Sequence, residues 1–154
     1  MTNNLPNIAL TGKLRSGKDT VGRYLCEKYG YTRFAFGDEL KRYANEIFDV
    51  KPGEKPRELY QWFGQTMRQR DPDVWVRKCF DAIRRREYNC IDYGEDPNAF
   101  RAVITDLRQP NEYERCRAEG FVIIRVNCPD YLRLLRSIDA GDSFSAADFE
   151  HETE

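Results

Sequence analysis

The sequence contains a single histidine and no C-x-x-C pair, so it lacks the usual ligand spacing of a zinc site and the usual motif of a redox site. Its cysteines are odd in number and scattered along the chain: Cys26, Cys79, Cys90, Cys116 and Cys128. Disulfide frameworks are typical of secreted chains with paired cysteines. We therefore expect reduced, structural thiols and a cytoplasmic location.

The chain also lacks an excess of charge of either sign. It has 25 lysines and arginines against 26 aspartates and glutamates, a net charge of −1 over 154 residues. Because the two signs are interspersed, no overall positive field favours nucleic acid or a membrane surface as a partner. No apolar run is long enough to span a bilayer, and residues 1–6 lack an apolar signal segment. We expect a soluble intracellular protein that consists of one domain.

The most informative motif is GKLRSGKDT at residues 12–20, which has the spacing of a P-loop. The glycine and lysine positions of G-x-x-x-x-G-K are filled by Gly12, Gly17 and Lys18. An apolar run at residues 8–10 precedes the motif and a helical pattern follows it. In that context, backbone N–H groups and a helix N-terminus bind phosphate, and the lysine adds a charge. A plain strand-to-helix turn is the alternative, and a chance match rarely falls in such a context.

The loop departs from the usual P-loop at one position. A serine or threonine normally follows the lysine and binds magnesium, but this chain has Asp19 there, with Thr20 one place later. The magnesium ligand on the loop therefore stays open between Asp19, Thr20, Ser16 and water.

Strand and helix patterns alternate along the chain. The apolar residues Val21, Leu25 and Tyr29 are spaced by four and form one helical stripe, which Gly30 ends. The expected strands span residues 8–10, 31–36, 102–106 and 121–126. The expected helices lie within residues 20–29, 37–48, 56–86 (two helices), 110–119 and 130–137, with a linker at 51–55 and a surface loop at 87–98. This pattern predicts an α/β, three-layer P-loop NTPase fold whose parallel sheet carries helices on both faces.

A carboxylate ends the third expected strand. Asp106 is followed two residues later by Arg108. Ligands of an open α/β sheet bind at the carboxyl edge of its strands, so Asp106 is placed to hold magnesium directly or through water, and Arg108 to reach a phosphate. The alternative is that Asp106 caps the following helix or pairs with Arg108.

Basic and amide side chains follow one face of the helix after Pro56. Arg57, Gln61 and Arg68 are separated by four and seven residues, and Arg70 and Lys41 belong to the same group. A guanidinium suits the phosphate of a nucleoside monophosphate, and an amide can bind a base edge. A solvated polar face is the alternative.

Two arginines lie on the last expected helix. Arg133 and Arg136 could neutralise the charge that spreads over a phosphoryl group during its transfer, as a lid does. The alternative is a surface helix with Leu132, Leu134 and Leu135 packed inward.

Together these motifs resemble the deoxynucleoside monophosphate kinase family of phages and some bacteria, within the P-loop nucleoside monophosphate kinases. The resemblance covers almost the whole chain. It is carried by residues 12–20, 34–41 (FAFGDELK), 57–64 (RELYQWFG), 73–76 (DVWV) and 105–112 (TDLRQPNE).

The resemblance implies transfer of the γ-phosphate of ATP to a deoxynucleoside monophosphate, with magnesium. The catalytic residues would be Lys18, Arg108, Arg133 and Arg136. ATP would contact Gly12, Lys13, Arg15, Ser16, Gly17, Lys18, Asp19 and Thr20, and magnesium would bind Asp19, Thr20 or Asp106. The acceptor would contact Asp38, Lys41, Arg57, Gln61, Arg68 and Trp75. A single domain, 1–154, would carry an acceptor-binding insertion at about 37–88 and a lid at about 129–145, and homodimer formation stays open.

The sequence departs from that family at its end. Residues 151–154, HETE, resemble a His-x-Ser/Thr-Glu motif after which family members continue into a further strand, a loop near the adenine and a final helix. We therefore expect the final strand to be absent. Two other hypotheses stay open: a P-loop kinase of another small phosphorylated acceptor, such as dephospho-coenzyme A, and a non-catalytic nucleotide-binding module.

Overall fold

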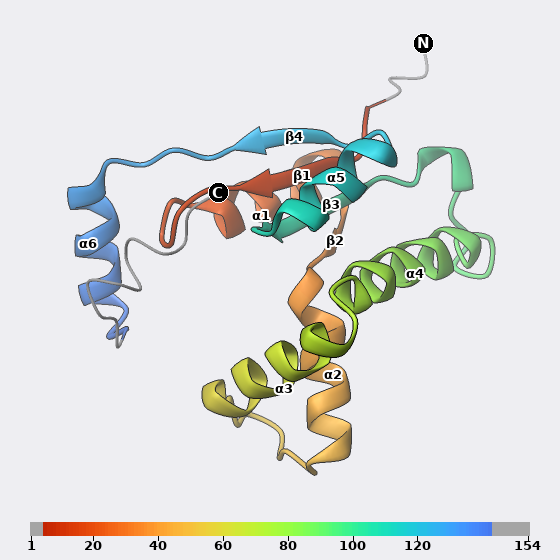
Figure 1. The fold of residues 1–154 in the computed structure, drawn as a ribbon. Helices are drawn as coiled ribbons and strands as arrows, with labels where there is room; N and C mark the ends of the chain where they lie inside the picture. The colour runs from red at the N-terminus through yellow and green to blue at the C-terminus, as the bar shows by residue number, and fades with distance from the viewer. Residues whose placement is uncertain (1–4, 143–154) are drawn as a thin grey trace.

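A four-stranded parallel sheet forms the centre of the structure, a computed structural model that describes residues 5–142 (Figure 1). The strands are β1 (Ile8–Thr11), β2 (Thr32–Phe34), β3 (Ala102–Leu107) and β4 (Val122–Arg125), in the order β2-β3-β1-β4. All three neighbouring pairs are parallel. The helices are α1 (Lys18–Tyr29), α2 (Phe36–Ile47), α3 (Arg57–Arg70), α4 (Val74–Tyr88), α5 (Pro110–Ala118) and α6 (Asp130–Asp139), with a 3-10 turn at Pro97–Ala99.

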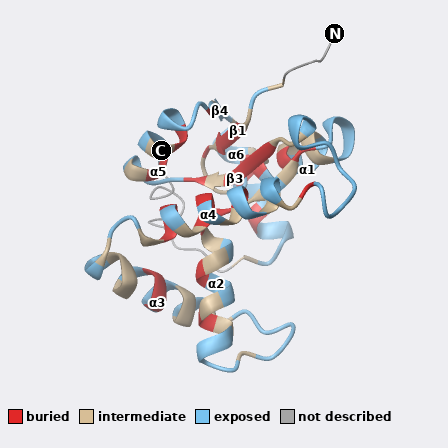
Figure 2. Cartoon of the chain, turned by 90° about the vertical axis from the view of Figure 1, so that its right-hand side faces the viewer, coloured by how far each residue is buried: buried red, intermediate tan, exposed pale blue. Residues whose placement is uncertain are grey.

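Helices cover both faces of the sheet, as predicted. Side chains alternate along β1, so Ile8 and Leu10 pack against Val21 and Leu25 of α1, whereas Ala9 joins the core on the opposite face. That second core is built mainly with side chains of α4 and α5 and with Phe36 of α2. Figure 2 shows buried residues on the strands and on the inward faces of the helices. The P-loop is thereby fixed at the carboxyl edge of a central strand.

Helices α2 and α3, with the start of α4, form an arm that extends away from the sheet (Figure 1). Its separate apolar cluster contains Leu40, Phe63 and Trp75. The Trp75 indole donates a hydrogen bond to the Gly64 carbonyl at 3.2 Å, which joins α4 to α3. A Cβ on Gly64 would lie 2.4 Å from Leu40 Cδ1, so a side chain there would require either Leu40 or α3 to move. The expectation of an acceptor-binding insertion at about 37–88 stays a prediction.

Some element boundaries differ from those predicted. The strand expected at 31–36 is shorter because Phe36 already begins α2, and α4 extends to Tyr88, into the expected loop. The edge strand β4 leaves Val122 and Ile124 45% and 39% exposed, although residues 121–126 are the most strand-like stretch of the sequence. The end of the expected lid and the HETE motif lie outside the described residues. Within residues 5–142, no helix combines the length and apolarity needed to cross a membrane.

Candidate active site

The loop between β1 and α1 makes two turns that require glycine. Gly12 has φ 144° and Gly17 has φ 105°, both in the region that side chains disfavour. A Cβ on Gly12 would lie 2.4 Å from the Val126 carbonyl oxygen and 2.8 Å from Ser16 Oγ. The loop therefore packs directly against the chain that leaves β4, and this close approach fixes the start of the P-loop.

The Lys18 side chain lies inside this loop. It is 8% exposed, and its Nζ donates hydrogen bonds to the carbonyl oxygens of Gly12 at 2.5 Å and Lys13 at 2.9 Å. An ammonium group has three donors, and two of them are used in these hydrogen bonds to loop carbonyls. A triphosphate entering the loop would compete with these carbonyls for the same ammonium group.

Next to the loop, Ser16 Oγ is buried without a hydrogen-bond partner among the described residues. Ser16 also lines a cavity of about 130 Å³ beside the loop. The other lining residues are Lys13, Arg125, Val126, Asn127, Cys128 and Asp130. A buried hydroxyl that lacks a partner costs free energy, which a ligand oxygen would recover. This orphaned hydroxyl and the cationic lining fit the phosphates of ATP.

Asp106 caps a helix other than the one that follows it. Its two carboxylate oxygens accept hydrogen bonds from the backbone N–H groups of Phe36 (2.7 Å) and Gly37 (3.0 Å), at the start of α2. Burial raises the pKa of Asp106, and these two hydrogen bonds act in the opposite direction. A Cβ on Gly37 would lie 3.4 Å from Asp106 Oδ2 and 4.0 Å from Lys41 Cε, so Lys41 passes beside this carboxylate.

A second buried carboxylate at this edge, Glu112, was missed in the sequence. Glu112 is 4% exposed, and its Oε2 accepts from the backbone N–H groups of Arg108 (2.8 Å) and Gln109 (2.9 Å). Burial raises its pKa to about 6, Asp106 adds to the rise, and the charge of Arg68 opposes it. Glu112 therefore fixes the backbone at Arg108. The spacing of Gln109 and Glu112 before an amphipathic run, a capping box, is the signal that could have found it.

Two arginines of α3 act electrostatically on carboxylates outside the arm. The charge of Arg68 acts on Glu112 below β3. At the other end, the hydrogen bond from Arg15 lowers the pKa of Asp142, and the charge of Arg57 lowers it further. Arg57 thus lies within electrostatic range of an ion pair made by the P-loop.

Other predicted acceptor residues are placed differently. Gln61 and Lys41 are exposed, and Asp38 is exposed with its Oδ2 accepting a hydrogen bond from Arg33 at 3.0 Å. Trp75 is only 4% exposed and packs against Phe63, with ring centroids 5.7 Å apart. Its contacts therefore hold the arm together.

The two arginines of α6 bind the P-loop backbone. Arg133 Nε donates to the Leu14 carbonyl at 2.8 Å, and Arg136 Nη1 donates to the Arg15 carbonyl at 3.0 Å. Arg133 is 1% exposed. The inward-leucine alternative is wrong for Leu134 and Leu135, which are 41% and 53% exposed. The helix turns a polar face toward the loop and an apolar face outward.

Magnesium would find few protein ligands here. Asp19 and Thr20 are exposed on the first turn of α1. In the part of the chain that the structure describes, no group of three or more His, Cys, Asp or Glu side chains could hold a metal ion. Magnesium commonly keeps several waters and binds through one or two carboxylates plus substrate phosphates. The residues present fit that mode of binding.

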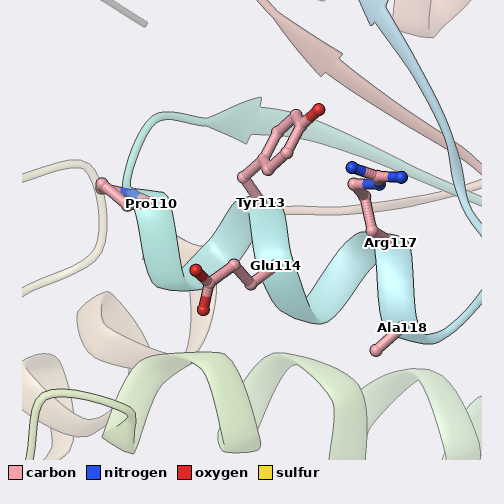
Figure 3. A pocket seen from close by; sticks show the side chains of 5 residues that line it. All are labelled: Pro110, Tyr113, Glu114, Arg117 and Ala118. Carbon is pink, nitrogen blue, oxygen red and sulfur yellow. The ribbon is translucent and has the colours of Figure 1, made fainter.

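A larger hollow, of about 550 Å³, lies elsewhere (Figure 3). Its lining residues, Pro110, Tyr113, Glu114, Arg117 and Ala118, all come from α5. No residue of the P-loop, α3 or α6 contributes to it. This hollow is therefore separate from the phosphate-binding loop, although it is the larger of the two.

Comparison with known proteins gives the family. The family model described as AAA domain matches residues 8–153. The chain belongs to the AAA domain family. The match begins at β1 and includes the P-loop, which agrees with the coarser part of the sequence prediction, a P-loop NTPase fold.

Solved structures similar to this AAA domain include a gluconokinase from Sinorhizobium meliloti 1021, with 12% identity and a TM-score of 0.46. That match covers 96% of this chain and 72% of the other. TT1252 from Thermus thermophilus is 21% identical, with a TM-score of 0.44 and coverage of 90% and 74%. No curated protein matches the chain.

Proposed function

We propose that this AAA domain transfers the γ-phosphate of ATP to a deoxynucleoside monophosphate, giving a diphosphate. One relationship supports this proposal most directly. Arg57, on the basic face of α3, acts electrostatically on Asp142, which is hydrogen-bonded to Arg15 of the P-loop. A cation suited to a monophosphate therefore lies within electrostatic range of an ion pair made by the loop suited to a triphosphate.

On the donor side, Lys18 would exchange the carbonyls of Gly12 and Lys13 for the β- and γ-phosphates. Backbone N–H groups of residues 13–18 and the start of α1 would bind the remaining phosphate oxygens. Ser16 Oγ would gain a partner there. Magnesium, held by Asp19, Thr20 or Asp106 directly or through water, would neutralise charge on the phosphates.

On the acceptor side, Arg57 would bind the phosphate of the monophosphate through its forked guanidinium, with Lys41 and Arg68 adding positive charge. The amide of Gln61 would bind a base edge. Because the acceptor is already a phosphate oxygen, no general base is needed, and the rate depends on alignment and charge neutralisation. Arg108 would act between the two sides, and its backbone N–H donates a hydrogen bond to Glu112.

The test is a transfer assay with ATP and magnesium across the deoxynucleoside monophosphates, with dephospho-coenzyme A as a further acceptor and Lys18→Ala as the background control. Formation of a deoxynucleoside diphosphate by the wild type alone supports the proposal. Phosphorylation of dephospho-coenzyme A alone would make the protein a different P-loop kinase. ATP binding without transfer to any acceptor would make it a nucleotide-binding module.

A further inference from the structure

We propose that Arg133 is a positioning residue: it acts on phosphate binding through the backbone of the P-loop, without touching the transferred phosphoryl group. This inference rests on the proposed function for its phosphate ligand. It replaces the lid role expected from the sequence with a role in holding the loop that binds the donor.

The contacts of Arg133 give the first argument. Its guanidinium donates to the Leu14 carbonyl from Nε (2.8 Å) and to Asp130 Oδ1 from Nη1 (2.7 Å). Asp130 lies one helical turn earlier on α6, with a side chain that is 73% exposed. The arginine side chain is 1% exposed. A buried charge is costly unless it is hydrogen-bonded, so these contacts fix the guanidinium in one orientation.

The geometry of the peptide bond connects this contact to phosphate binding. The carbonyl of Leu14 and the N–H of Arg15 belong to one planar peptide, and in a trans peptide they point in opposite directions. Holding the Leu14 carbonyl against Arg133 therefore turns the Arg15 N–H away from α6. Backbone N–H groups of such a loop bind phosphate oxygens, and we assign this N–H to one of them.

Two further contacts hold the same short segment. Arg136 donates to the Arg15 carbonyl at 3.0 Å, and the Arg15 side chain pairs with Asp142 just beyond α6. Arg15 itself has φ 59°, which is unusual for a residue with a side chain. The backbone of Leu14 and Arg15 is thus held from α6, and Arg133 is the buried member of the set.

A positioning role and a lid role predict different kinetics. A residue that orients the P-loop affects the binding affinity of every ligand that the loop binds, so its loss raises Kd even when no transfer takes place. A lid arginine stabilises charge that develops during transfer, so its loss lowers kcat while the affinity for ATP stays the same.

The experiment compares the wild type with Arg133→Met, Arg133→Lys and Leu135→Ala, an exposed position on the same helix. We expect Arg133→Met to raise the Kd of ATP and the Kd of inorganic tripolyphosphate alike by about tenfold. This is the effect of losing one charge-assisted hydrogen bond, the one from the Arg15 N–H to a phosphate oxygen. In Arg133→Met, the Kd of the monophosphate acceptor should stay unchanged. The control Leu135→Ala should keep the wild-type values of all these constants. In NMR titrations with tripolyphosphate, the Arg15 amide signal should shift less in Arg133→Met than in the wild type.

Other outcomes overturn the proposal. A large fall in kcat with unchanged affinity for ATP would mean that Arg133 touches the reacting group. A lower Tm with unchanged affinity and kcat would mean that it only supports the fold. If Arg133→Met does not fold, Arg133→Lys decides by the same measurements, because lysine keeps the charge but cannot make both hydrogen bonds. A wild type that binds ATP but transfers nothing would refute the proposed function and leave this binding test intact.

Discussion

Arg15 and Asp142 form a two-pronged ion pair that joins the P-loop to the chain just after α6. Arg15 Nε donates to Asp142 Oδ2 at 2.7 Å, and Nη2 donates to Oδ1 at 2.6 Å. The two residues are separated by 127 positions in the sequence. This pair places the end of α6 beside the phosphate-binding loop, with the charge of Arg57 acting on it from α3.

Replacement of Lys18 tests the donor side. We expect Lys18→Ala to lower kcat/KM for transfer by at least about two orders of magnitude, because the ammonium charge is used at the phosphates. Lys28→Ala, an exposed lysine on the same helix, is the control and should keep wild-type activity. Steady-state kinetics measures the activity of both variants, and circular dichroism checks that both are folded. Retained transfer activity in Lys18→Ala would overturn the P-loop assignment.

Replacement of Arg57 tests the acceptor side. We expect Arg57→Ala to raise KM for the monophosphate by about tenfold or more, with a change of less than about threefold for ATP, since the charged hydrogen bond is made to the acceptor phosphate. Gln69→Ala, exposed on the same helix, should change neither constant. An equal rise in KM for both substrates would show that Arg57 does not bind the acceptor specifically.

The raised pKa of Glu112 makes the stability of the fold depend on pH. Its pKa is raised from 4.5 to about 6, so the folded protein binds the proton more tightly than the unfolded chain does. The free energy of unfolding therefore falls as the pH rises through this window, by about 2 kcal/mol. Glu112→Gln keeps an acceptor for the N–H groups of Arg108 and Gln109 but cannot titrate.

Urea denaturation of both proteins from pH 4 to pH 7 measures the effect. The stability of the wild type relative to Glu112→Gln should decrease between pH 4.5 and pH 6. A difference that does not vary with pH, or that grows as the pH rises, would show that burial does not raise this pKa.

The close packing of Gly64 against Leu40 limits which side chains the arm can accept at position 64. A Cβ there would lie 2.4 Å from the buried Leu40 side chain, so Gly64→Ala should push α3 away from α2 and lower stability by about 1–3 kcal/mol. Thermal unfolding measures the loss. Gln65→Ala, one residue along and exposed, should leave Tm nearly unchanged. A stability gain in Gly64→Ala, from the higher helix propensity of alanine, would show that Leu40 can move aside.

The sequence predicted the features that depend on local patterns. The P-loop with its strand and helix, the alternation of strands and helices, and the α/β class follow from spacing and periodicity over short windows. These elements could be found because their signals lie within a few residues of one another.

The partners of individual side chains could not be predicted in this way, because they depend on residues far apart in the chain. Asp106 caps α2, whose first N–H groups lie about 70 positions earlier, and nothing near Asp106 in the sequence indicates this. Arg133 binds the Leu14 carbonyl across 119 positions. Trp75 is buried in the arm because side chains of α2 and α3 pack against it, and the spacing within its own helix does not specify those partners.

The most direct test of the central claim is the affinity of a bisubstrate ligand, in which five phosphates join adenosine to a deoxynucleoside. If the P-loop and the basic face of α3 bind the two ends together, this ligand should bind at least about a hundredfold more tightly than ATP, through the effective concentration of a joined ligand. Its advantage should disappear in Arg57→Ala. A bisubstrate ligand that binds no more tightly than ATP to the wild type would contradict the account.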